Sequence, residues 1–349
     1  MRSTLIPQNL PSTISPISVR SIQDNLAKAQ VELSSGRWND VGYKLAEQTG
    51  SVLNVRAQIS LIDTFENTNS IVSARADVTQ NALANIASET QIFFEAVIAG
   101  RNNQVSSEVV AKTAADGFGA VISSINSTIN GVYVFSGINF DSPPLQDYFG
   151  TPQPASKSAV DAAFLAEFGF DQSDPAVAGI TPAAMENFID NAFSDLFDPT
   201  NWQNDWSDAT DETLKTRIAF TQFSETSQSA NESAIRKLAM AYTMVADLGI
   251  GSLNDSTRER MMEKAADLTG SVIGELNVLR GKVGVTQQRI EVATDKLAIQ
   301  KNAFERLVGD QENVDPYEVA TRISVLSNQL EASYTLTARL QQLSLVKFI

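Results

Sequence analysis

The side chains of this sequence that are most suited to chemistry are four carboxylates close to Trp206. They are Asp205, Asp208, Asp211 and Glu212. Carboxylate oxygens are the ligands that calcium prefers, but a calcium loop of the EF-hand kind places a ligand at every second residue and needs a glycine for its turn. This segment has neither feature. We therefore interpret it as a solvated acidic loop or a helix N-terminus, where negative charge is favourable, and predict no metal site.

Two other segments resemble parts of functional motifs and fail on spacing. Gly281-Lys282 is similar to the end of a phosphate-binding loop, but Leu276 stands where that loop needs its first glycine. Val283 then replaces the serine or threonine that would bind the magnesium ion. Ser136 lacks the leading glycine of a nucleophile elbow. Neither segment predicts a nucleotide-binding or hydrolytic site.

The composition narrows the possible chemistry further, because the chain contains no histidine and no cysteine. Disulfides, thiolate nucleophiles, Cys/His zinc sites and a histidine general base are therefore excluded. Nothing else in the sequence assembles an acid, a base and a nucleophile. We predict a protein without catalytic residues, cofactor or metal. An enzyme or binding module in the middle of the chain, which is rich in Phe and Trp, stays open as an alternative.

The chain is acidic, and its acidity belongs to one segment. The 349 residues are 43% apolar and carry a net charge of −15, which is enough chain for two or three domains. Residues 140–230 hold 15 acidic and 3 basic side chains and so contribute −12 of that charge. Such a segment repels nucleic acid and anionic lipid. We therefore predict no nucleic-acid partner and no membrane insertion.

Hydropathy along the chain gives no targeting signal of the common kinds. No run of 18 apolar residues occurs, so we expect no membrane-spanning helix. The first residues lack the apolar core of a cleaved signal peptide. If the protein leaves the cell, we expect it to use another route.

Long helices must position whatever function the chain has. No glycine or proline occurs between Gly50 and Gly100, so this interval can form one helix of about 70 Å. Its heptad seam needs a long partner, which residues 257–307 can provide. We predict that the two seams form the core of a rod. The predicted core residues are Ile62, Phe65, Val72, Leu83, Ile86, Phe93, Leu276, Val283, Ile290, Leu297 and Phe304.

Two further seams lie at the ends of the chain. Pro316 is predicted to open the last helix, with Asp315 as its N-cap. A pair of terminal helices buries too little apolar surface to be firmly stable alone, so its remaining apolar side chains predict contact with other copies. The predicted assembly interface comprises Val19, Ile22, Leu26, Leu33, Val319, Ile323, Leu326, Leu330, Leu336, Leu340, Leu343 and Val346.

The segment between the rod helices has mixed signals. Seven of the 11 prolines lie between Pro143 and Pro199. Residues 131–137 and 217–220 favour strands, whereas residues 182–197 favour a helix. We predict a mainly α protein: a long antiparallel helical rod with terminal coiled-coil helices and a small inserted α+β domain. The terminal assembly domain would comprise residues 1–50 and 310–349, the rod 51–139 and 231–309, and the acidic outer domain 140–230.

Several short motifs, taken in their order, resemble the flagellin superfamily. Leu33-Ser-Ser-Gly-Arg37 follows an N-terminal amphipathic helix, and residues 338–349 are similar to the end of that superfamily. Within it, residues 131–137 followed by Asp141-Ser-Pro-Pro144 are similar to the hook-associated proteins that join hook to filament. In this superfamily, paired terminal helices form a coiled coil in the core of the flagellum.

This resemblance implies a structural role outside the cell. It implies export, unfolded and without a cleaved signal peptide, through the flagellar type III apparatus. The implied partners are like subunits in a helical or ring assembly, the hook, a second junction protein, and an export chaperone on the C-terminal helix around Leu340, Leu343 and Val346.

Two alternatives to the junction role remain open. The ending Lys347-Phe-Ile349 differs from the Leu-rich ending usual in the family and leaves room for a filament flagellin. A secreted coiled-coil scaffold or adhesin is the other alternative.

Overall fold

The computed structural model describes the backbone of residues 11–346 and the side chains of residues 18–46 and 48–339. The chain is mainly helical, as predicted. Its helices are α1 (Pro11–Ser35), α2 (Val41–Leu45), α3 (Thr49–Arg101), α4 (Ser107–Ile125), α5 (Ala155–Phe168), α6 (Pro182–Phe188), α7 (Pro199–Asn201), α8 (Ser233–Asp247), α9 (Asp255–Glu312) and α10 (Pro316–Val346). Short helical turns cover Ala46–Gln48, Pro175–Gly179, Ile189–Phe193 and Trp202–Trp206. The strands are β1 (Thr128–Ile129), β2 (Val132–Tyr133), β3 (Lys215–Ala219) and β4 (Gln222–Glu225), which form two antiparallel hairpins.

The chain divides into two compact units. The terminal unit contains Met1–Asp63 and Ala298–Ile349, and the central unit contains Thr64–Leu297. Helices α3 and α9 contribute residues to both units. The prediction of one helix across the interval without glycine or proline is confirmed, because α3 has 53 residues.

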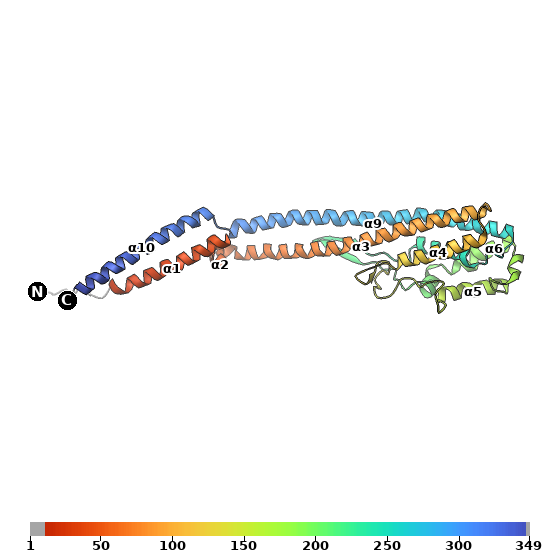
Figure 1. Ribbon diagram of the computed structural model, residues 1–349, viewed down its shortest axis with the longest axis horizontal. Helices are drawn as coiled ribbons and strands as arrows, with labels where there is room; N and C mark the ends of the chain where they lie inside the picture. The colour runs from red at the N-terminus through yellow and green to blue at the C-terminus, as the bar shows by residue number, and fades with distance from the viewer. Residues whose placement is uncertain (1–10, 347–349) are drawn as a thin grey trace. The chain divides into compact units, whose positions relative to one another are not determined.

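In the terminal unit, α1 packs against α10 (Figure 1). The N-cap predicted for α10 is confirmed, since the main-chain N–H of Tyr317 donates to Asp315 Oδ1 at 2.8 Å. Ala29, Val314 and Val319 form the buried centre of the pair, and Trp38 packs against them. A second small core joins α2 to the ends of α3 and α9 in this unit. It comprises Leu45, Val52, Val55 and Val308.

The central unit is built on α3 and α9, which run antiparallel. Three hydrogen bonds show this direction: they join Asn69 to Thr294, Asp77 to Gln287, and Gln80 to the main chain of Arg280. Residue numbers therefore rise along α3 as those of the paired residues fall along α9. Helices α4 and α8 pack against each other beside this pair.

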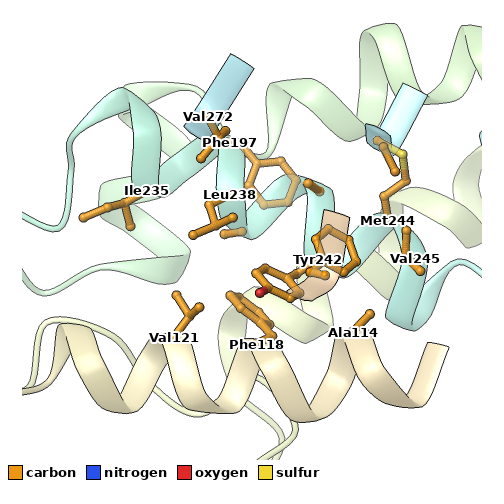
Figure 2. Packing of buried hydrophobic residues seen from close by; sticks show 14 of the residues in the cluster. Ala114, Phe118, Val121, Phe197, Ile235, Leu238, Tyr242, Met244, Val245 and Val272 are labelled. Carbon is orange, nitrogen blue, oxygen red and sulfur yellow. The ribbon is translucent and has the colours of Figure 1, made fainter. Parts of the chain in front are cut away.

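Aromatic and aliphatic side chains together fill the core of the central unit (Figure 2). The ring of Tyr242 on α8 stacks on Phe93 of α3 at 4.2 Å and on Phe118 of α4 at 5.6 Å between centroids. The Tyr242 hydroxyl donates to the main-chain oxygen of Glu89 at 3.0 Å, which satisfies its one buried polar group. These stacked rings therefore join three helices without leaving a polar atom unpaired.

The inserted segment shares this core. Its buried aromatic residues belong to the same hydrophobic cluster as α4 and α8, and Trp206 stacks on both Trp202 and Tyr148. The shared residues include Tyr148, Phe164, Phe188, Phe193, Phe197, Trp202 and Trp206. Segment 140–230 is therefore an α+β insertion that completes the core of the bundle as well as facing solvent.

The two hairpins lie at the edges of the insertion. The strand predicted within residues 131–137 is the short β2, paired with β1 through a turn at Asn130 and Gly131, which both have positive φ. The second hairpin, β3–β4, packs on α3 and α9, because Ile218 is buried with Val72 of α3 and Ile290 of α9.

Candidate assembly surface

The residues predicted as rod core lie inside the two units, with one difference of degree. Phe304 is half-buried, and the other ten are buried. The buried residues are Ile62, Phe65, Val72, Leu83, Ile86, Phe93, Leu276, Val283, Ile290 and Leu297. These side chains are therefore used within one chain.

The residues predicted as an assembly interface fall into three groups. Val319 is fully buried against α1 of the same chain. Leu33 and Leu336 are exposed, at 43% and 59%. The half-buried residues are Val19, Ile22, Leu26, Ile323, Leu326 and Leu330. Leu340, Leu343 and Val346 belong to α10, but their side chains lie outside the described residues.

The structure adds apolar side chains to this surface that the seam analysis missed. Val31, Val325 and Tyr334 are about half exposed on α1 and α10. The Tyr334 hydroxyl accepts a hydrogen bond of 2.7 Å from the side-chain amide of Gln23, which joins the two helices. The signal that could have found Val31 and Val325 is their apolar character beside the seam positions. With Leu33 and Leu336, Val31 and Val325 make up what we call the terminal apolar surface, which a single chain leaves largely uncovered.

A buried carboxylate holds the terminal unit together. The side chain of Glu312 is only 4% exposed, and it forms ion pairs with Arg56 on α3 and with Arg37. The hydrogen bond to Glu312 raises the pKa of Arg56. The main-chain oxygen of Glu312 accepts from the N–H of Trp38 at 3.1 Å. Glu312 therefore connects α9 both to α3 and to the segment that follows α1.

A second buried carboxylate joins the terminal helices. Glu32 on α1 accepts from Arg322 on α10 at 2.8 Å and from the main-chain N–H of Asn39 at 3.2 Å. The guanidinium of Arg322 also lies 5.3 Å from the centre of the Trp38 ring, within cation–π range. The loop after α1 is therefore fixed by α10 on one side and by α9 on the other.

We predict that Glu312→Gln lowers the free energy of unfolding of the terminal unit by about 1–2 kcal/mol, because it removes charge-assisted hydrogen bonds while Arg56 and Arg37 stay partly solvated. Urea denaturation followed by Trp38 fluorescence in a chain with Trp202 and Trp206 replaced by Phe measures this change. The matched control is Glu318→Gln, since Glu318 makes an exposed pair with Arg322 four residues on, where the cost is about 0.5 kcal/mol or less. Equal losses in the two variants would contradict the role of Glu312.

One carboxylate of the acidic run in the central unit, that of Asp211, is held by hydrogen bonds. Asp211 accepts from the side-chain amides of Asn231 at 2.7 Å and Gln203 at 2.6 Å. Among the described residues, no three or more acidic side chains gather where they could hold a metal ion.

Within the same part of the chain, no helix is long and apolar enough to span a membrane.

A buried polar network ties the inserted segment to α8. Lys157 on α5 donates to both carboxylate oxygens of Asp247 at 2.9 Å, and the Tyr148 hydroxyl donates to Asp247 at 2.7 Å. Burial raises the pKa of Asp247, although the bonds from Lys157 and Tyr148 oppose this shift. Burial also raises the pKa of Tyr148. The network gives the Tyr148 hydroxyl, the Lys157 ammonium and the Asp247 carboxylate hydrogen-bond partners and fixes α5 on α8.

An exposed ion-pair network between α6 and α9 predicts a pH dependence of stability. Arg260 holds Glu186 through two hydrogen bonds of 2.7 and 3.0 Å, and these bonds, followed by that from Lys264, lower the pKa of Glu186 to about 2. A carboxyl whose pKa is lowered on folding stabilises the folded state above its unfolded pKa and loses this contribution as pH falls. The contribution of Glu186 should therefore disappear between the ordinary pKa of 4.5 and about 2.

We expect the free energy of unfolding of the wild type to fall more steeply than that of Glu186→Gln over this interval, as measured by urea denaturation at a series of pH values. High salt should reduce the difference, because the pair is exposed. Glu167→Gln is the control, since Glu167 is exposed and forms no ion pair among the described residues. A Glu186→Gln profile parallel to that of the wild type would contradict the assignment.

Comparison with known proteins bears on both ends of the chain. Residues 6–140 match the family described as the bacterial flagellin N-terminal helical region, and residues 266–349 match the bacterial flagellin C-terminal helical region. Together these matches cover more than half of the chain. No curated protein matches the sequence.

One similar solved structure is described as that of a flagellar hook-associated protein from Vibrio parahaemolyticus. It has a TM-score of 0.52 and 9% sequence identity, and the match covers 76% of this chain and 97% of that one. At this identity the likeness concerns the fold. A known protein therefore shares this fold over about three quarters of the chain.

Proposed function

We propose that this chain, which belongs to the bacterial flagellin superfamily, is a structural subunit of the flagellum that joins hook to filament. The superfamily is one of structural proteins, not of enzymes, and its members assemble into the axial structures of the flagellum. The chain then acts outside the cell. Its mechanism is self-assembly through the terminal helices.

The observation that carries this proposal is the terminal apolar surface. The paired helices α1 and α10 expose Leu33 and Leu336. Apolar side chains exposed on a two-helix unit are covered most favourably by the same side chains of neighbouring copies. The two matched family regions include these two helices.

The junction role, rather than the filament, is supported by two further points. The solved structure with the similar fold is described as a hook-associated protein. The motif at residues 131–137, which resembles the junction proteins, is the second point. It contains part of the β1–β2 turn and contacts the insertion through the hydrogen bond from Gly137 N–H to the Gln228 oxygen. We propose the hook and a second junction protein as neighbours in the axis.

Export and chaperone binding belong to the same proposal. We propose that the chain leaves the cell unfolded through the flagellar type III apparatus without a cleaved signal peptide. A chaperone that covers α10 before export would mask the exposed Val325 and Leu336, because these side chains have no cover in the single chain.

Deletion of the gene tests the junction role. We expect cells that carry hooks without filaments and that release filament protein into the medium, with recovery when the gene is supplied in trans. Normal hooks with normal filaments would contradict the proposal and favour a secreted scaffold.

Filament flagellin is the second candidate, because both matched family regions carry the flagellin description. Purified chain added to short filament seeds distinguishes the two roles. Growth of long filaments made of this chain alone would favour the filament role, and incorporation that stops at the seed end would favour the junction.

A further inference from the structure

Helix α9 has a second apolar row in addition to the one that packs on α3. The buried row passes through Leu276, Val283 and Ile290. The second row repeats at the same spacing of seven residues and is 44–62% exposed. It comprises Val278, Val285 and Val292. A helix with two heptad rows has two faces that can accept a partner, and the described chain covers only one of them.

A cationic row runs beside this exposed row. Lys282, Arg289 and Lys296 are also seven residues apart and exposed, and none of them forms an ion pair or hydrogen bond among the described residues. Lys282 and Arg289 lie three residues before and four residues after Val285, so the two rows are neighbours on the helix surface. This face of α9 is therefore both apolar and positive, in a chain whose net charge is −15.

The β3–β4 hairpin makes the opposite wall of a groove along this face. Phe223, which is 62% exposed, and Lys215 line the groove across from Val285 and Arg289. Two carboxylates, Glu225 and Glu232, also line the groove. The Glu225 carboxylate lies 3.9 Å from the Lys215 ammonium. We call this the cationic groove. Its cations outnumber its carboxylates by three to two, and the unpaired Lys282 and Arg289 beside Val285 and Phe223 fit an acidic partner.

A second groove between α3 and α9 has the opposite charge. Its carboxylates are Glu66, Asp77, Glu291 and Asp295, and no lysine or arginine lines it. Asn69, which is buried in its wall, has a side-chain oxygen with no hydrogen-bond partner. We call this the acidic groove.

The two grooves share no residue and open on different faces of the rod. At 100° per residue, Glu291 and Asp295 lie roughly 140° around α9 from the cationic row. The α9 residues of the cationic groove are centred near Val285, and those of the acidic groove are centred near Glu291. These two centres are about 9 Å apart along the helix. Both grooves therefore lie at nearly the same level of the central unit.

We infer that the cationic groove of one copy binds the acidic groove of the next. This inference rests on the proposed function as an assembling subunit and adds a lateral contact through the central unit to the contact through the terminal helices. A second copy is the occupant that the charges favour, because each copy carries both complementary faces at the same level. A contact between two cationic grooves would place Lys282 and Arg289 opposite like charges.

The contact is heterologous, since different faces meet, and it repeats from copy to copy into a ring or a helix. Parallel neighbours would be offset by only about 9 Å along the axis. The exposed valines and Phe223 would then be covered by the α3–α9 surface of the neighbour.

Charge reversal on each face tests this contact in cells that lack the native gene and express full-length variants. Lys282→Glu with Arg289→Glu, and separately Glu291→Lys with Asp295→Lys, should each reduce the amount of the chain in sheared flagella at least tenfold. The four changes combined should restore it to within about twofold of the wild type, because every contact again joins opposite charges. Circular dichroism of the purified variants shows whether each one folds.

The outcomes separate this inference from the proposed function. Absence of the wild-type chain from sheared flagella would overturn both. Wild-type incorporation together with normal incorporation of both reversed variants would overturn the lateral contact alone. A folded four-change variant that incorporates no better than the single-face variants would also overturn it.

Cysteine cross-linking tests the geometry directly, because the chain has no native cysteine. In flagella that contain a mixture of Arg289→Cys and Asp295→Cys chains, we expect an oxidised dimer, and we expect at least tenfold less dimer when either variant is present alone. Asn81→Cys, at an exposed position on α3, mixed with Arg289→Cys is the matched control. Dimer formation by Arg289→Cys alone would overturn the heterologous arrangement.

Discussion

Replacing Gly137 with alanine is expected to lower the free energy of unfolding of the central unit by about 4 kcal/mol. Gly137 has a φ of +67°, which disfavours a side chain. An added Cβ would also lie 2.7 Å from the main-chain oxygen of Glu212 and closer still to Thr210. Thr210 and Glu212 both belong to the inserted segment. This segment is held here by the hydrogen bond from Gly137 N–H to the Gln228 oxygen at 3.0 Å. The backbone would have to separate the insertion from the end of the β1–β2 hairpin.

Gly131 provides the matched control for this prediction. It also has a positive φ, of +80°, but no atom lies within 4 Å of the position that a Cβ would occupy. Gly131→Ala should therefore cost only the backbone strain, about 1 kcal/mol. Thermal and urea unfolding followed by Trp202 and Trp206 fluorescence measures both variants. Similar losses at the two positions would show that steric contact with Thr210 and Glu212 does not matter.

Leu336→Glu is expected to leave the stability of the single chain nearly unchanged and to reduce incorporation into flagella at least tenfold. Leu336 is 59% exposed, so the glutamate stays solvated in the single chain. In the proposed assembly the same position is covered by a neighbour, where an unpaired carboxylate costs several kcal/mol and each 1.4 kcal/mol corresponds to a factor of ten. Incorporation is measured by the amount of the chain in sheared flagella, and stability by circular dichroism melting.

Ser327→Glu is the control for the terminal apolar surface. Ser327 is exposed on the same helix, and nine residues place it about half a turn away from Leu336. This variant should incorporate like the wild type. Equal incorporation of Leu336→Glu and the wild type would remove the terminal apolar surface from the assembly mechanism, whereas loss with both variants would indicate a general effect of charge on α10.

The helices of this protein were predictable because their causes are local. The interval without glycine or proline became α3, and the Asp315-Pro316 pair became the start of α10. Each of these signals is complete within a few residues. The short β2 was predictable for the same reason, since the Asn130-Gly131 turn supplies the positive φ that the hairpin requires.

The division of the seams between core and surface was not predictable. Val319 and Leu336 both occupy seam positions of the last helix, yet the first is fully buried and the second is mostly exposed. The difference depends on which side chain of α1 lies opposite, and Ala29 is the residue that covers Val319. Heptad spacing shows that a helix has a partner face, but it does not show how far along that face the partner reaches.

The sequence alone determined the helical class of the protein, the absence of histidine and cysteine chemistry, and the concentration of negative charge in residues 140–230. These properties depend on composition and on spacing within a few turns. The tertiary structure alone decided that the aromatic residues of the insertion complete the core with α4 and α8, and that α9 carries grooves of opposite charge on two faces. It also decided that Glu312 pairs with Arg56, which is 256 positions away. Burial and ion pairing depend on contacts between residues distant in the chain, and local periodicity contains no information about which of those residues meet.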